Sequence, residues 1–453
     1  MKIIIIALAV VFIIFPRWIY HTADVHYYFF PDSFSYIDRA IEIAGGKNFI
    51  HPRRLPLYPF IINSLVPIKK DTIINFQTVN QGIKINFRPL EDLQMYFGFF
   101  GGLFFALLSL KIFGKNWKFL LIMIIYGMNL YIFGWEKNIL TESFTMNFLI
   151  IYLYVIYKFI RSGNLFFLII STVITNLVFL LKPAYLFLCL SCLPFLLYYF
   201  FKNNNNNKIF PVIIISLFSL AIPLYYRFEN KRLYNYDGIS IVLDYNLMGK
   251  IIQYGLDTSE INVDKDYDEV LKVCAASKKD KAEMRKINNC IHLLNLKNDP
   301  YNIKANTLIG VFARKVILKH PADYLIKSFL LLPTVFTDIE EGWIVINQKF
   351  HLLNIFWIIL EDFYKLLRYI MLLFLLFYPL SIFQFFKKTD KTTTIIVLTG
   401  TIVFYGIIFN TFFAHVEYDR LKSVVDPLLL LFCLYYLFNL PFLKKYVDKI
   451  TKI

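Results

Sequence analysis

The sequence predicts an all-α fold, a polytopic transmembrane helical bundle of about 10–12 spans. Of the 453 residues, 58% are hydrophobic and 19% are aromatic, whereas soluble domains are roughly 45–50% apolar. Apolar runs long enough to cross about 30 Å of hydrocarbon as helix recur along the chain. We count ten such segments: Ile3–Tyr20, Gln94–Phe113, Trp117–Phe133, Ile139–Tyr157, Leu165–Leu181, Ala184–Phe201, Ile209–Tyr226, Tyr364–Phe386, Thr394–Phe413 and Val424–Phe442.

Basic residues in the short loops predict the orientation of the chain. They collect in alternate loops, for example at Lys111 and Lys115 and again at Lys387 and Lys388. Short loops rich in Lys and Arg remain in the cytoplasm, so we expect both termini there, with the first apolar run kept as an anchor. The net charge of +16 is mostly a topology signal of this kind and does not indicate a nucleic-acid partner.

The predicted spans divide the chain into three regions. Residues 1–226 form an N-terminal transmembrane module whose first outer loop, residues 21–93, is too polar to span the membrane. Residues 227–350 form a small helical extracytoplasmic region, because their charged stretches favour helix and almost lack strand alternation. Residues 351–453 form a C-terminal transmembrane module.

Four short segments are predicted to lie near the membrane surface. In the first outer loop, Ser33–Ala44 and Pro56–Val66 are predicted as interfacial helices. Leu325–Phe336 and His351–Leu360 are apolar but too short to span comfortably, and we interpret them as interfacial or re-entrant. The number of spans between residues 320 and 365 therefore stays open.

The cysteines and histidines do not predict a metal site. Cys189 and Cys192 have no second pair and lie inside a predicted span, so we interpret them as small core residues. Cys274 and Cys290 fall in the large outer loop, where a disulfide can form. The histidines show no metal-ligand spacing: His21, His26, His51, His351 and His415. We expect no cofactor.

Charged residues gather at the predicted outer membrane surface. Charged side chains next to hydrocarbon are costly, so they usually have a functional role or an ion-pair partner. The main ones are Asp32, Arg54, Glu142, Lys182 and Arg420. A carboxylate opposed to several cations suits a reaction in which a hydroxyl attacks while a lipid phosphate leaves. The carboxylate takes the proton, and the cations stabilise charge on the departing phosphate. Asp32 and Asp38 are possible bases, of which Asp32 is the candidate catalytic residue. The three cations are candidate anion contacts.

The acids of the first outer loop also have structural interpretations. Asp32 could be the N-cap of the Ser33–Ala44 helix, since Asp is a favoured cap. Asp38 is interpreted as a solvated residue, because six positions along a helix it does not share the face of Asp32, whereas Tyr36 does.

The remaining charges have alternatives as well. Arg53 and Arg54 could both be anchors that bind lipid headgroups. Glu142 is predicted one turn inside a span, where an unpaired charge is costly. Either it belongs to the site or it forms a buried pair with Lys137 or Lys182.

Five short motifs together resemble a known family. They are Asp32-Ser33-Phe34-Ser35-Tyr36 with Ala40, Arg54-Leu55-Pro56-Leu57-Tyr58-Pro59, Thr141-Glu142, Lys182-Pro183, and Glu417-Tyr418-Asp419-Arg420 with Pro427. In this order and membrane setting the chain resembles the GT-C superfamily of polytopic glycosyltransferases, and within it the bacterial group similar to protein O-mannosyltransferases and the lipid A aminoarabinose transferase.

The resemblance implies an integral membrane glycosyltransferase of the cell envelope. It would transfer a sugar with inversion from a polyprenyl-phosphate carrier to lipopolysaccharide, a glycolipid, a polymer or a protein, at the outer face of the bacterial inner membrane. Asp32 matches the family base, and Arg54 matches the basic residue that approaches the carrier phosphate. Ser33 stands where many relatives have a second acid, so a role for a divalent metal stays open. Further substrate contacts are expected at Tyr36, Tyr58, Glu142, Lys182 and Arg420.

Two other functions fit part of the pattern. An O-antigen polymerase or ligase is also polytopic with a large outer loop, but such enzymes tend to concentrate arginines and a histidine in late outer loops. A transporter of polyprenyl-linked sugars would place charges near mid-bilayer, and the predicted spans are almost free of them.

The predicted topology can be tested with a reporter that is active only outside the cytoplasm. A fusion after Lys208 should be silent and a fusion near Lys279 should be active, because the first follows a basic loop and the second lies in the large outer loop. The reverse pattern would overturn both the orientation and the placement of the charged residues.

Overall fold

The computed structural model describes residues 2–23, 28–68, 85–114, 116–275, 290–291, 293–294, 296, 299–337, 351–414 and 418–440. Within these ranges the secondary structure is helical, apart from an isolated bridge between Tyr28 and Asn138. The predicted all-α fold class is confirmed. Glu417 and most of the stretch 279–296, which the sequence analysis also singled out, lie outside the described residues.

Each apolar segment predicted from the sequence is mainly helical over its described residues. Six straight segments are long and apolar enough to cross a membrane, and two bent helix pairs raise the number to eight. The straight spans contain α1 (Lys2–Ala23), α5 (Arg88–Phe113), α8 (Glu142–Ser162), η2 (Pro183–Tyr185) with α10 (Leu188–Lys202), η3 (Asn206–Lys208) with α11 (Ile209–Leu217), η4 (Phe218–Leu220) and α12 (Ala221–Tyr234), and α21 (Lys391–Phe413). Multiple apolar helices of this length indicate an integral membrane protein.

The remaining apolar helices are bent or short. The bent pairs are α6 (Trp117–Gly127) with α7 (Leu130–Phe133) and η1 (Gly134–Lys137), at 56°, and α19 (His351–Leu372) with α20 (Phe374–Lys387), at 44°. The short ones are α9 (Leu165–Leu181) and α23 (Asp426–Asn439). His351–Leu360 is therefore not a separate interfacial segment. It is the first part of α19, because nothing in the sequence breaks the helix before Leu372.

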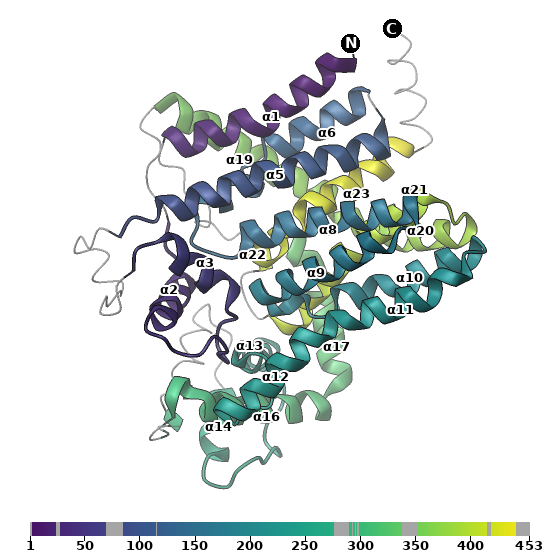
Figure 1. Cartoon of the computed structure of the whole chain (residues 1–453). Helices are drawn as coiled ribbons and strands as arrows, with labels where there is room; N and C mark the ends of the chain where they lie inside the picture. Colours follow the sequence, from purple (N-terminus) through teal and green to yellow (C-terminus); the bar gives the residue numbers. More distant parts are fainter. Residues whose placement is uncertain are drawn as a thin grey trace.

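Helices α8 and α21 form the centre of the bundle. In their apolar windows 78% and 72% of residues are buried, against 28% for α1 and 33% for α5. Large apolar side chains such as Ile3, Phe100 and Phe210 are exposed on the outer helices, as expected where lipid is the solvent. Figure 1 shows α1, α6, α5 and α8 running side by side.

Two short helices between α1 and α5 lie at one end of the bundle (Figure 1). They are α2 (Pro31–Ala44) and α3 (Leu57–Leu65), which pack against each other. The predicted N-cap role of Asp32 is wrong. The helix begins at Pro31, because proline is favoured at the first helical position, and the Ser33 hydroxyl accepts the N–H of Phe30 at 3.0 Å. The Asp32 carboxylate is thus available for other partners.

A separate core lies in the region between α12 and α19. It is built by α13 (Ile241–Tyr254), α14 (Asp268–Ala275), α16 (Ile303–Lys319) and α17 (Pro321–Leu330). Two further short helices, η5 (Pro300–Asn302) and α18 (Leu332–Thr337), lie in this part of the chain, and Val335 and Phe336 of α18 belong to the core of the main bundle. Buried residues such as Met248, Ile251 and Phe312 fill the separate core. Cys274 and Cys290 form a disulfide within this core, with their Cα atoms 5.7 Å apart, as the sequence analysis predicted.

Removal of this disulfide should loosen the separate core. The bond joins residues 16 positions apart, and a loop of about 15 residues contributes about 3 kcal/mol in the chain-entropy model. The double replacement Cys274→Ser and Cys290→Ser should lower the thermal unfolding midpoint of the purified protein. Labelling of both cysteines by a maleimide without prior reduction would contradict the assignment.

Candidate functional site

The candidate site is centred on Asp32, in the first turn of α2. An extended pairing places this turn, because Tyr28 donates its N–H to Lys137 O at 3.1 Å and accepts the N–H of Ile139 at 3.2 Å. The chain then enters α2 next to the start of α8. Two arginines reach the carboxylate: Arg54 Nη2 donates to Oδ1, and Arg420 Nη2 donates to Oδ2 at 2.9 Å.

A second carboxylate extends this chain of charges. Arg420 also donates its Nε–H to Glu142 Oε1 at 2.7 Å, and Lys182 Nζ donates to the same oxygen at 3.2 Å. Glu142 is the first residue of α8 rather than one turn inside a span, and it is fully buried. The sequence left its partner open between two lysines. The structure pairs it with Lys182, while Lys137 lies 4.0 Å from Glu91 in another cluster.

The five charged residues alternate in sign and come from five parts of the chain, with Asp32 in α2 and Glu142 in α8. Arg54 comes from the loop between α2 and α3, Arg420 from α22 (Tyr418–Ser423), and Lys182 from the end of α9. Three cations and two carboxylates leave a formal charge of +1. The cluster is therefore suited to receive an anion.

Two tyrosines support Arg54. Its guanidinium lies 4.5 Å from the centre of the Tyr36 ring, within the range of a cation–π interaction, and its Nε–H donates to Ser35 Oγ at 2.7 Å. Tyr58 lies behind Tyr36 in edge contact, with ring centroids 5.1 Å apart. It is fully buried and donates its hydroxyl to Gln94 Oε1 at 3.0 Å. The structure thus brings all seven predicted site residues together.

The arginines control the charge of Asp32. Burial by itself would raise the pKa of this carboxyl, but the charges of Arg54 and Arg420 outweigh burial and hold the pKa well below its usual range. Asp32 is therefore ionised, and in this arrangement it is a weak base. Its side chain keeps 35% of its surface exposed, so an incoming group can reach it.

Asp38 is solvated, as the sequence analysis expected, and Arg53 lies beside the site. Both residues are exposed. Burial nevertheless raises the pKa of Asp38, with Arg53 opposing the shift. These two residues serve as matched controls for Asp32 and Arg54.

His51 was missed by the sequence analysis. Its Nδ1 accepts the backbone N–H of Arg53 at 3.1 Å and that of Arg54 at 3.4 Å, and its own backbone is bonded to the Tyr226 hydroxyl of α12. Burial, together with the charge of Arg39, lowers the pKa of His51 to about 3. The ring is therefore neutral at physiological pH and positions Arg54. The short spacing of His51 before the two arginines was the available signal.

A buried network holds Arg420 in place. Lys422 Nζ donates to Asp426 Oδ1 at 2.7 Å, and the Tyr364 hydroxyl of α19 donates to the other oxygen of Asp426. Ser423 donates its hydroxyl to the carbonyl of Arg420 at 2.6 Å. The i, i+4 spacing of Lys422 and Asp426 was a signal for this pair in the sequence.

Among the residues that the structure describes, no group of three or more His, Cys, Asp or Glu side chains is placed to hold a metal ion. The fold and the site together define a polytopic membrane protein with a partly exposed, cation-rich cluster at one end of its helices.

Comparison with known proteins finds similarity at the level of solved structures. No family model and no curated protein matches the chain. The solved structure of the archaeal oligosaccharyltransferase AglB from Archaeoglobus fulgidus, in complex with an inhibitory peptide and a dolichol-phosphate, is similar with a TM-score of 0.47 and 11% identity. The match covers 99% of this chain and 51% of that one, so the chain spans about half its length. At this level the comparison assigns no residue and no activity.

The role of His51 can be tested with two replacements. In His51→Asn the side-chain oxygen can still accept the backbone N–H of Arg53, two residues further along the chain. In His51→Phe the ring is kept, but it has no hydrogen-bond acceptor. The family resemblance implies that Arg54 binds a phosphate. On that expectation His51→Phe should weaken phosphate binding by about fivefold, the effect of one neutral hydrogen bond, and His51→Asn should preserve it. Equal affinity for a lipid phosphate in the two variants would contradict the positioning role.

His51 also makes the stability of the folded protein depend on pH. Because burial lowers the pKa of His51 from 6.5 to about 3, the unfolded chain takes up a proton below about pH 6.5 that the folded chain does not. This residue therefore makes stability fall as the pH decreases from about 6.5 towards 3. His51→Asn should lose less thermal stability than the parent protein between pH 7 and pH 5.

Proposed function

We propose that the protein is an integral membrane glycosyltransferase that transfers a sugar, with inversion, from a polyprenyl-phosphate donor to an extracytoplasmic acceptor. The observation that carries the proposal is the alternating cluster Arg54, Asp32, Arg420, Glu142 and Lys182 at the ends of membrane helices. The motif resemblance to GT-C glycosyltransferases supports the same activity, and it matches each of these residues to a position of the family pattern.

The cations would bind the donor phosphate. Arg54 and Arg420 present guanidinium donors around a shared carboxylate, and guanidinium groups bind phosphate oxygens in pairs. A phosphate that enters the site competes with Asp32 for these donors. As the arginines turn to the phosphate, the pKa of Asp32 rises towards its usual value and the carboxylate becomes a better base.

The chemical step is a single displacement. The acceptor hydroxyl attacks the anomeric carbon of the donor sugar, the bond from this carbon to the phosphate oxygen breaks, and the phosphate leaves with the electron pair. Asp32 takes the hydroxyl proton, and Arg54 and Arg420 stabilise the charge on the leaving phosphate. One displacement at the anomeric carbon inverts its configuration.

The remaining site residues would position this machinery. Glu142 holds both Arg420 and Lys182 through one oxygen, so it fixes two cations relative to each other. Tyr36 supports the Arg54 guanidinium, and the fully buried Tyr58 supports Tyr36. The acceptor would be lipopolysaccharide, another glycolipid, a polymer or a protein at the outer face of the inner membrane.

The activity can be tested by mass analysis of envelope glycans and lipids from cells with and without the protein. Loss of one sugar from one class of molecule is expected when the protein is absent. Unchanged glycans and lipids, with an unchanged pool of polyprenyl-linked sugars, would contradict the proposal.

Replacement of the base should remove most of the activity. Asp32→Asn keeps the size of the side chain but cannot take a proton, and loss of general-base catalysis lowers rates by about 10²–10⁴-fold. The rate of sugar transfer by membranes containing the variant gives the result. Asp38→Asn is the control and should be nearly silent, since its side chain is exposed. Normal transfer by a correctly inserted Asp32→Asn protein would show that the base is another residue.

Replacement of the phosphate contact should weaken use of the donor. Arg54→Ala should raise the donor concentration needed for half-maximal transfer, and Arg54→Lys should recover only part of the loss, because an ammonium lacks the two-pronged geometry. The exposed neighbour provides the control Arg53→Ala. An equal effect of Arg53→Ala and Arg54→Ala would favour the headgroup-anchor interpretation of both arginines.

A further inference from the structure

The helical region from α13 to α17, the α13–α17 region, contacts the loop that carries Arg54. Helix α13 begins at Ile241, whose backbone N–H donates to the carbonyl of Pro52 at 2.8 Å. Tyr301 of η5 packs edge-on against the ring of His51, with ring centroids 4.4 Å apart. His51 in turn accepts the backbone N–H of Arg54. Two contacts from this region therefore support the backbone next to that arginine.

Tyr301 is presented to His51 by a strained turn. Its φ is 62° and that of Asn302 is 55°, in the left-handed region that residues other than glycine rarely adopt. The Asp299 carboxylate ties this turn to the start of α16, because it accepts the backbone N–H groups of Lys304 and Ala305 at 2.9 Å each. Such strain persists only where surrounding contacts determine the conformation, and it is concentrated at functional positions.

The same region contacts α22, which carries Arg420. Lys250 of α13 is fully buried, and its Nζ donates to the Tyr418 hydroxyl at 2.7 Å. The Tyr418 hydroxyl donates to Gln253 Oε1 at 2.8 Å. Tyr418 is the first residue of α22, and Arg420 is two residues further on. A buried ammonium is costly unless it is hydrogen-bonded, so this contact holds the start of α22 against α13.

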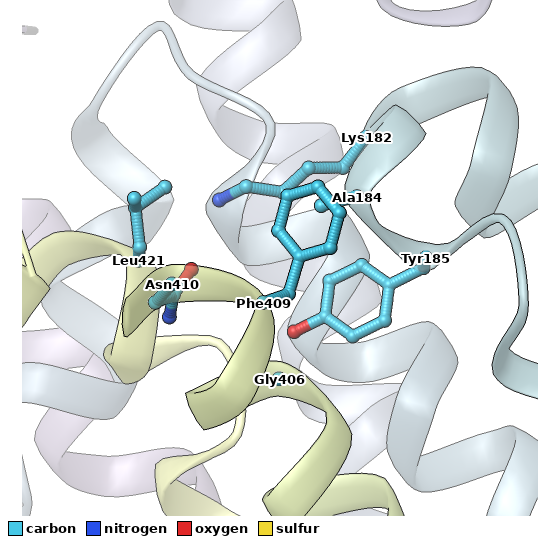
Figure 2. A pocket seen from close by; sticks show the side chains of 7 residues that line it. All are labelled: Lys182, Ala184, Tyr185, Gly406, Phe409, Asn410 and Leu421. Carbon is cyan, nitrogen blue, oxygen red and sulfur yellow. The ribbon is translucent and has the colours of Figure 1, made fainter. Parts of the chain in front are cut away.

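Beyond Arg420, α22 is less tightly packed. Its next residue, Leu421, lines a small cavity together with Lys182, Tyr185 and Asn410 (Figure 2). The volume of this cavity is about 10 Å³, which is room for about one water molecule. Protein interiors are normally close-packed, so the cavity leaves this side of α22 with less support. The contact with α13 is therefore important for the position of Arg420.

We infer that the α13–α17 region sets the positions of both arginines of the charged cluster, with Tyr301 and Lys250 as the positioning residues. The inference rests on the proposed function and assigns a role to a region that supplies none of the five charged residues. Two arginines that bind one phosphate together must keep a fixed separation. One region that contacts the supports of both maintains this separation.

Binding measurements on the full chain in lipid nanodiscs test this role. The probes are undecaprenyl phosphate and undecaprenol, which has the same lipid chain but no phosphate. The ratio of their affinities reports the contacts made to the phosphate, because general loosening of the protein would weaken the binding of both. Lys250→Met keeps most of the apolar side chain but removes the ammonium. It should lower the ratio by about 3- to 10-fold, in the range of one hydrogen bond.

Two replacements of Tyr301 separate the effect of its ring from that of its backbone. Tyr301→Gly removes the ring, and glycine adopts a positive φ readily, so the turn itself should persist. This variant should lower the ratio by about 2- to 10-fold, in the range of one aromatic contact. Tyr301→Phe keeps the ring and loses the hydroxyl, which donates to Glu42 Oε1 at 2.8 Å. It should therefore lose much less than Tyr301→Gly.

Lys327→Met is the matched control for Lys250→Met. Lys327 is a half-buried lysine of α17 in the same region, and its Nζ donates to the carbonyl of Tyr254 in α13 at 2.7 Å. Its hydrogen bond thus joins two helices of the region to each other and does not reach α22. The control should leave the affinity ratio unchanged.

The outcomes distinguish the two proposals. An unchanged ratio in both Lys250→Met and Tyr301→Gly, or an equal loss of affinity for the two probes, would overturn the positioning role and leave the proposed function standing. A lower ratio in only one of these variants would overturn the role of the residue replaced in the other, and Tyr301→Gly tests the region if Lys250→Met does not fold. If the parent protein binds undecaprenyl phosphate no more tightly than undecaprenol, or if Arg54→Ala does not lower the ratio, the proposed function is overturned and the positioning role with it.

Discussion

The functional end of this protein depends on one carboxylate that two arginines share. Asp32 joins α2 to the loop that carries Arg54 and to the short helix that carries Arg420. Those segments are more than 380 residues apart at their extremes, and no continuous helix connects them. Arg420 also pairs with the fully buried Glu142, and removal of one member of a buried pair leaves an uncompensated charge, which typically costs about 3–5 kcal/mol. The alternating charges therefore fix the positions of these segments as well as the chemistry they perform.

The same pairing sets a conflict between stability and reactivity. Two guanidinium groups keep Asp32 ionised, yet they also lower its affinity for a proton. For Asp32 to accept a proton readily, the two guanidinium groups must form their hydrogen bonds with another anion. In the proposed reaction a phosphate draws them away, so full basicity would develop only when the donor is bound. Coupling of this kind would limit unproductive chemistry at an exposed carboxylate.

The bundle presents this chemistry from its most buried helices. Glu142 begins α8 and Asn410 lies near the end of α21, and these two spans are 78% and 72% buried. Their neighbours shield them from lipid, so polar groups at their ends can be held in defined positions. Two neutral side chains support Arg54. His51 accepts the backbone N–H of Arg54, and Tyr58 packs against Tyr36, whose ring contacts the Arg54 guanidinium.

The sequence alone determined the membrane class, the apolar segments and the charged residues of the candidate site, because apolar length and charge placement are local properties of the chain. It misplaced the start of α2 and left the partner of Glu142 open. It also gave no role to His51. Those assignments depend on which groups meet across the bundle: the Tyr226 hydroxyl for the His51 backbone, and Lys182 for Glu142. Only the tertiary structure decides such contacts, since they join residues that are distant in the chain.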